Sequence, residues 1–170
     1  MSSSRFDTPI DQRYFEDYVP GTVHEFGPIA VDEAEVVTFA QRFDPQWIHT
    51  DPAAAQRGPF HGLIASGWHS IGLLMRLFVH HYLSSVASLA SPGVDEVRWH
   101  KPVRPGDELR LRVSTTATRR SQTKPDRGLV HSLLEGLNQH DEVVVSFKAM
   151  NMLKLRDGSA EPPARPPKQP

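Results

Sequence analysis

The stretch that decides the fold lies between residues 62 and 83 and reads GLIASGWHSIGLLMRLFVHHYL. Apolar residues recur in it at helical spacing, and they cover most of the circumference of the helix that this spacing predicts. Because the same helix also carries His69, Ser70 and Arg76, it is typical of a buried element in a globular core rather than of a membrane span. Other segments of the chain must therefore wrap around it.

The segments that follow this helix show the alternation of β-strands. Leu109, Leu111 and Val113, for example, alternate with two arginines. The predicted strands span residues 94–99, 109–118, 129–138 and 142–155, and a further strand or pair of strands, residues 22–31, precedes the helix. The sequence therefore predicts an α+β fold with a curved antiparallel β-sheet wrapped around one long central helix, and the last two strands are predicted to form a hairpin.

Two shorter helices are predicted between the first strand and the long helix. Asp32 and Glu35 match the start of the first helix, which Pro45 ends because the residue before a proline is pushed out of the α region. Asp51 matches the N-cap of the second helix, with Pro52 at its first position. Side chains between these two helices are thus presented by a short connection.

Length and composition predict one globular domain. A chain of 170 residues has the size of a single domain, and its 38% hydrophobic content is enough to fill one core. The polar residues 1–12 are predicted to be a flexible tail, and the proline-rich residues 157–170 a disordered one. Residues 13–156 then form the domain.

Charge and residue usage exclude several kinds of function. A formal net charge of −1 provides no bulk attraction for nucleic acid or for an anionic membrane. The absence of cysteine rules out disulfides, thiolate metal sites and a cysteine nucleophile, and the nine histidines lack the spacing of metal-binding motifs. No secretory signal and no apolar run of about 20 residues is found, so a cytoplasmic location is expected, with neither a membrane nor a nucleic acid as partner.

An acid/base pair is predicted in residues 43–52, which read FDPQWIHTDP. Asp44 projects from the end of the first short helix, and His49 follows five residues later in the connection. A carboxylate and an imidazole in such proximity can hold a water molecule between them and move its protons. This pair suits the addition of water to a double bond, or its removal.

Two further motifs accompany this pair, HGLIASGWHS at residues 61–70 and VRPGD at residues 103–107. Together the three motifs resemble those of the MaoC-type dehydratases, the hotdog-fold family that contains the (R)-specific enoyl-CoA hydratases. The resemblance covers residues 13–155. It implies a hydro-lyase that reversibly adds water to a 2-enoyl-CoA, or a related enoyl thioester, to give a 3-hydroxyacyl thioester. It implies no cofactor, since coenzyme A is part of the substrate.

Carried over residue by residue, the resemblance makes Asp44 and His49 the catalytic dyad. It makes Gly62 a backbone donor to the oxyanion and Ser70 a helper near the dyad. Because the long helix is predicted to begin at Gly62, free N–H groups there would stabilise an enolate-like transition state. Trp47 stands where members of that family often carry a proline. Its bulk leaves the dyad intact and is expected either to reshape the acyl pocket or to contact a neighbouring subunit.

Further residues are predicted to contact the substrate, namely Trp47, His61, Ser66, Trp68, Arg119 and Arg120. The two arginines belong to a basic turn region that either meets the phosphates of coenzyme A or is a solvated face. For Ser66, as for Ser70, the ordinary alternative is a helix hydroxyl bonded to the preceding turn. His61 is explained better by packing than by a place at the pocket entrance.

Two other functions remain open on the same fold. One is an acyl-CoA thioesterase, which would release free thiol, and the other is a non-catalytic subunit that binds acyl thioesters. The resemblance also implies a homodimer, or a higher homo-oligomer built from dimers, in which two sheets join side by side. Such an interface would cover the exposed edge strands of a small curved sheet.

Overall fold

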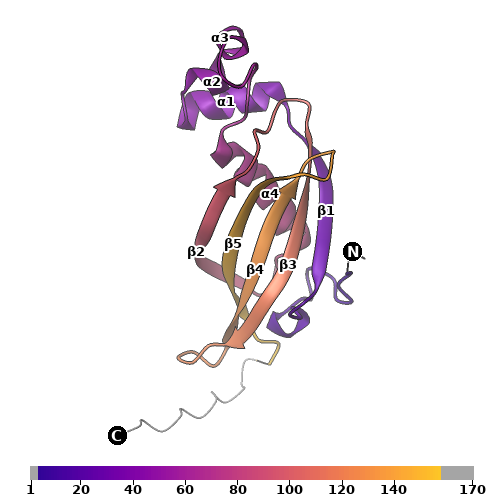
Figure 1. Ribbon diagram of the computed structural model, residues 1–170. Helices are drawn as coiled ribbons and strands as arrows, with labels where there is room; N and C mark the ends of the chain where they lie inside the picture. Colours follow the sequence, from indigo (N-terminus) through magenta and orange to yellow (C-terminus); the bar gives the residue numbers. More distant parts are fainter. Residues whose placement is uncertain (1–3, 158–170) are drawn as a thin grey trace, which may run out of the picture.

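One antiparallel sheet of five strands curves around the long helix α4 (Figure 1). The computed structural model describes residues 4–157. The strands lie in the order β1-β3-β4-β5-β2, and all neighbouring strands are antiparallel. The predicted α+β fold is confirmed. In chain order the elements are the 3₁₀ helix η1 (Phe15–Asp17), β1 (Val23–Ala30), α1 (Glu33–Phe43), α2 (Trp47–Thr50), α3 (Pro52–Gln56), α4 (Gly67–His81), β2 (Ser88–Trp99), β3 (Glu108–Arg120), β4 (Arg127–Leu137) and β5 (Val143–Lys154).

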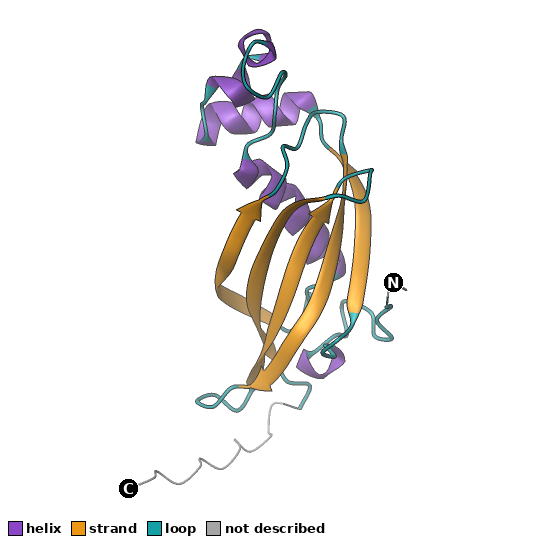
Figure 2. Ribbon diagram, viewed as in Figure 1, coloured by secondary structure: helices purple, strands orange, loops and turns teal. Residues whose placement is uncertain are grey.

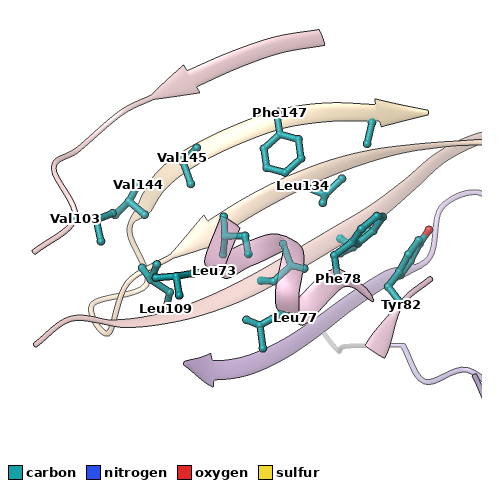
Figure 3. Packing of buried hydrophobic residues seen from close by; sticks show 14 of the residues in the cluster. Leu73, Leu77, Phe78, Tyr82, Val103, Leu109, Leu134, Val144, Val145 and Phe147 are labelled. Atoms are coloured by element: carbon teal, nitrogen blue, oxygen red, sulfur yellow. The ribbon is translucent and has the colours of Figure 1, made fainter. Parts of the chain in front are cut away.

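The core lies between α4 and the face of the sheet that curves around it (Figure 3). Leu74 and Phe78 of α4 are fully buried there. The strands contribute alternate residues, because successive side chains of a strand point to opposite faces. In β3, Leu109, Leu111 and Val113 are fully buried, whereas the arginines between them are only half-buried. The helical stripe and the strand alternation of the sequence thus meet in one core.

Helix α4 begins at Gly67 and not, as predicted, at Gly62. Residues 63–66 are not helical, and the N–H groups of Ile64 and Ala65 bond to other segments of the chain. The N–H of Ala65, for example, donates to the carbonyl of Val103 at 2.8 Å. The remaining α4 has 15 residues, and within residues 4–157 no helix is long and apolar enough to cross a membrane.

Three short helices, α1 to α3, gather at one end of the sheet (Figure 2). As predicted, the side chain of Asp32 caps α1 by accepting the N–H of Glu35, and the side chain of Asp51 caps α3 by accepting the N–H of Ala54 (both 2.9 Å). The short helix α2 was not predicted. It contains His49, which the sequence placed in an irregular connection.

The loop between β2 and β3 holds this helical end to the sheet. Val31, just before α1, donates its N–H to the carbonyl of Asp107 and accepts the N–H of Gly106, both at 2.9 Å. The guanidinium of Arg104 donates to the carbonyl of Phe60 at 2.6 Å. The loop that carries the VRPGD motif therefore fixes both chain segments that frame the candidate site.

The N-terminal segment, which was predicted to be a flexible tail, packs against the domain through Phe6. The ring of Phe6 stacks on the ring of His24, with 4.1 Å between their centroids, and the guanidinium carbon of Arg13 lies 3.4 Å from the centroid of Phe6. One aromatic residue thus anchors an otherwise polar stretch. The predicted C-terminal tail, residues 157–170, lies outside the described residues apart from its first residue.

Candidate active site

A cavity of about 430 Å³ opens where the short helices meet the first turn of α4. Its walls come from three parts of the chain that are distant in sequence: the α1–α2 connection, the segment that enters α4, and the end of β2 with the loop after it. The lining residues are Asp44, Gln46, His49, Phe60, Ile64, Ala65, Gly67, Trp68, Ser70, Trp99, His100, Lys101, Pro102 and Val103. Both members of the predicted dyad therefore face one cavity.

Asp44 follows the last residue of α1 and is held from two sides. Its Oδ1 accepts the side-chain N–H of Gln46, and its Oδ2 accepts the hydroxyl of Ser66, both at 2.7 Å. The hydrogen bond from Gln46, then that from Ser66, holds the pKa of this carboxyl below its usual value, with a smaller contribution from His49. Asp44 is therefore an ionised hydrogen-bond acceptor at neutral pH.

His49 is buried in α2 and is oriented by a backbone group. Its Nδ1 lies 2.9 Å from the carbonyl oxygen of Ile64. Because a carbonyl only accepts, Nδ1 carries the proton and donates it to this bond. The other ring nitrogen, Nε2, lies 3.5 Å from Oδ2 of Asp44. The structure thus brings the predicted pair together and assigns a direction to the imidazole.

The two serines of the second motif have different roles in this arrangement. Ser66, predicted to contact substrate, is fully buried and donates to Asp44 instead. Ser70 lines the cavity, and its hydroxyl donates to the backbone carbonyl of Ser66 at 3.3 Å. The bond from Ser70 is the ordinary helix hydroxyl interaction that its sequence position allows.

The prediction that Gly62 offers a free N–H at a helix N-terminus is wrong. Gly62 lies five residues before α4, and its N–H donates to the carbonyl of Ala55 at 3.1 Å. Its φ of 146° is a conformation that side chains rarely adopt, which explains the glycine without a catalytic role. The N–H groups in the first turn of α4 begin instead at Gly67, which lines the cavity.

Of the other predicted substrate contacts, the structure brings only Trp68 into the cavity wall. Trp47, 48% exposed, packs on Gly58 instead, and His61 is exposed. Arg119 and Arg120 are the last residues of β3, at the end of the sheet opposite α1–α3 (Figure 1). Within one chain they therefore do not lie near Asp44 and His49.

The wall supplied by the end of β2 was missed by sequence reasoning. The ring of Trp99 meets that of Trp68 edge to face, with 5.5 Å between their centroids. Lys101 lines the cavity and forms an ion pair with Glu142, and His100 lies beside it. No local signal in these residues points to the dyad, because the contact depends on how β2 pairs at the sheet edge. Gln46, by contrast, lies within the first motif and could have been found there.

Comparison with known proteins agrees with this geometry. The model of the MaoC like domain matches residues 16–133. The MaoC-like dehydratase from Rhodospirillum rubrum is 36% identical, with a TM-score of 0.78 over 85% of this chain and 98% of that one. The (R)-hydratase from A. caviae involved in PHA biosynthesis is 25% identical, with a TM-score of 0.63 over 81% of this chain and 96% of that one.

A curated relative has a name from the same group. The 3-hydroxyacyl-thioester dehydratase Z of Mycobacterium tuberculosis (strain ATCC 25618 / H37Rv) is 38% identical over 84 residues. The match spans 48% of this chain and 56% of that protein, so it concerns about half of each. With a family model that covers most of the described domain, a shared fold and an Asp/His pair on a cavity wall, the chain belongs to the MaoC-like dehydratase family.

Proposed function

We propose that this protein reversibly adds water to a 2-enoyl thioester of coenzyme A to give the 3-hydroxyacyl thioester. The observation that carries the proposal is the separation of 3.5 Å between Nε2 of His49 and Oδ2 of Asp44, on the wall of a cavity of about 430 Å³. Nε2 and the carboxylate are both acceptors on the cavity wall, so one water molecule can donate to each of them. Dehydratases and hydratases among the relatives support a hydro-lyase of this kind.

The dyad accounts for both protons of the reaction. Since Nδ1 of His49 is committed to the carbonyl of Ile64, Nε2 of the neutral ring accepts. A water between the two side chains donates one O–H to Nε2 and the other to the carboxylate of Asp44. Positioned proton transfer of this kind typically contributes about 10²–10⁴-fold to a rate.

In the addition, the water oxygen forms a bond to C3 while one of its O–H bonds breaks and the proton passes to the dyad. The electrons of the C2=C3 bond move towards the thioester carbonyl, which becomes an enolate oxygen. The dyad then returns a proton to C2, on the face from which the water came. Water is consumed, the dyad regains its starting state, and the reverse sequence is the dehydration.

The enolate oxygen requires a hydrogen-bond donor, and the first turn of α4 offers one. Gly67 is the first helical residue, and it lines the cavity. The first N–H groups of a helix have no acceptor within the helix and lie at the positive end of its dipole. We assign this role to the N–H of Gly67, in place of that of Gly62.

A homodimer joined along β2 is part of the proposal. β2 is an edge strand, and Val94 and Trp99 in it are 45% and 48% exposed. An unpaired edge with exposed apolar side chains is stabilised when a second copy covers it. Light scattering should give twice the mass of the 19.1 kDa chain, and Val94→Lys should shift the mass towards that of one chain. A monomeric wild type would refute this part.

The decisive experiment measures the loss of enoyl-thioester conjugation by ultraviolet absorbance, across short, long and branched 2-enoyl-CoAs. Asp44→Asn and His49→Ala should each lower turnover by about 10²–10⁴-fold. Asp51→Asn is the matched control, since it makes the same change of charge in the same motif and asparagine caps a helix as well as aspartate does. Unchanged hydration in both dyad variants would refute the mechanism.

Free thiol is assayed in parallel with absorbance. Thiol release by the wild type, without hydration, would assign a thioesterase instead. Tight binding of acyl-CoA with no turnover across the whole panel would assign a binding subunit.

A further inference from the structure

Two buried serines lie near the dyad, and they are arranged in series. Ser66 contacts Asp44, with 2.7 Å between its Oγ and Oδ2 of the carboxylate. Ser70 contacts Ser66, since both its N–H and its hydroxyl donate to the carbonyl of Ser66, at 3.0 and 3.3 Å. We propose that Ser66, and not Ser70, is the serine that positions the carboxylate of Asp44 and, together with Gln46, holds it as an acceptor. In its consequence for catalysis this inference rests on the proposed hydration.

The hydroxyl of Ser66 is fixed by its place at the start of α4. It is the N-cap of this helix, and its oxygen accepts the N–H of Trp68 at 3.3 Å. A hydroxyl has one proton to donate, and with a lone pair already engaged by the helix that proton points to Asp44. The side chain is also fully buried, so solvent does not compete for it. The N-terminus of the long helix is thereby linked to the carboxylate through one oxygen atom.

This link explains how Asp44 remains an acceptor beside His49. The hydrogen bonds from Gln46 and Ser66 keep the pKa of Asp44 low. Ser66 also lies at the N-terminus of α4, and the positive end of a helix dipole favours a nearby negative charge. The titratable group next to the carboxylate is His49, at 3.5 Å, and His100 and Lys101 line the same cavity. Of the two donors, Ser66 is fully buried and its hydroxyl also caps α4, whereas the bond from Gln46 is exposed.

The test reads the ionisation of Asp44 directly. Carboxyl carbons are labelled with ¹³C in aspartate, and the signal of Asp44 is assigned by its loss in Asp44→Asn. In Ser66→Ala the pKa of Asp44 should rise, because a donor to the ionised form is lost. Ser70→Ala is the matched control, and the Asp44 titration should stay at its wild-type position. Ser66→Thr, which keeps a hydroxyl, should restore the wild-type titration.

A second variant protects the test against loss of the helix cap. Alanine is a poor N-cap, whereas glycine is nearly as good as serine, so Ser66→Gly removes the hydroxyl and keeps the start of α4. Both variants should show the same upward shift of the Asp44 pKa. An unshifted titration in Ser66→Ala and Ser66→Gly, or an equal shift in Ser70→Ala, would overturn the inference.

Turnover supplies the second readout. Removal of a hydrogen bond to a charged group should lower kcat by about tenfold in Ser66→Ala and Ser66→Gly, with little change in KM. Ser66→Thr should recover most of that loss. If the wild type hydrates no enoyl thioester, the proposed function fails while the Asp44 titration still decides the role of Ser66. If hydration is found and Ser66→Gly turns over like wild type, the inference fails and the function stands.

Discussion

Replacing Gly67 with alanine tests how closely the indole of Trp99 packs on the first turn of α4. An added Cβ would lie 2.2 Å from Nε1 and 2.4 Å from Cε2 of Trp99, far inside the 3.4–4 Å of ordinary contact. Gly72, on the same helix, has no atom within 4 Å of an added Cβ. The substitution Gly72→Ala is therefore the control for the effect of alanine on the helix alone.

The magnitude follows from two opposing effects. Overpacking typically costs about 1–3 kcal/mol, and replacement of glycine by alanine inside a helix returns about 0.5–1 kcal/mol. Trp99 is 48% exposed and can swing into solvent, which limits the cost. Gly67→Ala should therefore lower the free energy of unfolding by about 0.5–2 kcal/mol, whereas Gly72→Ala should raise it by about 0.5–1 kcal/mol.

Urea denaturation of both variants measures these changes, and tryptophan fluorescence of the folded state reports whether the indole moves. Gly67→Ala should shift the native fluorescence, because Trp99 leaves its place beside α4. It should also raise KM, since the displaced ring belongs to the cavity wall. If the Gly67→Ala protein is as stable as the Gly72→Ala protein and has the fluorescence of the wild type, Trp99 does not pack on the first turn of α4.

Further predictions concern ionisation, the cavity wall and the core. The folded-state pKa of Asp44 lies below its usual value of 3.8, so ionised Asp44 stabilises the fold fully above pH 3.8 and loses this contribution as the pH falls through the lowered pKa. Urea titrations from pH 6 downwards should show this loss of stability. The Asp44→Asn variant should not show it. Lys101→Ala should raise KM for an enoyl-CoA by about two- to fivefold but leave that for the phosphate-free pantetheine thioester unchanged. The control Arg119→Ala/Arg120→Ala should leave both KM values unchanged. If this double variant raises KM for the enoyl-CoA and Lys101→Ala does not, the basic turn that contains the two arginines is the coenzyme A contact. Leu74→Ala, at a fully buried position, should lower the free energy of unfolding by about 2–5 kcal/mol. A loss below about 1 kcal/mol in denaturant titrations would contradict the burial of Leu74 in the core.

The sequence by itself determined the elements whose signals lie within a few residues. Asp32 and Asp51 cap α1 and α3 as predicted, because an N-cap side chain bonds to the backbone three residues later. Strands β3, β4 and β5 follow from alternation for the same local reason, whereas β2 shows no alternating burial. Asp44 and His49 also lie on one short segment of the sequence, so they are close to each other in space largely independently of the rest of the fold.

The tertiary structure alone decided where α4 begins, and with it the donors around the dyad. Apolar spacing continues through residues 62–66, yet the carbonyls of Ala55 and Val103 take the N–H groups of Gly62 and Ala65. Those acceptors lie on other segments, so no local pattern reveals them. Ser66, which the predicted helix would place in its interior, therefore becomes the N-cap before Gly67, and this position makes it the partner of Asp44. Backbone hydrogen bonds go to the best acceptor in space, and only the folded chain shows which acceptor that is.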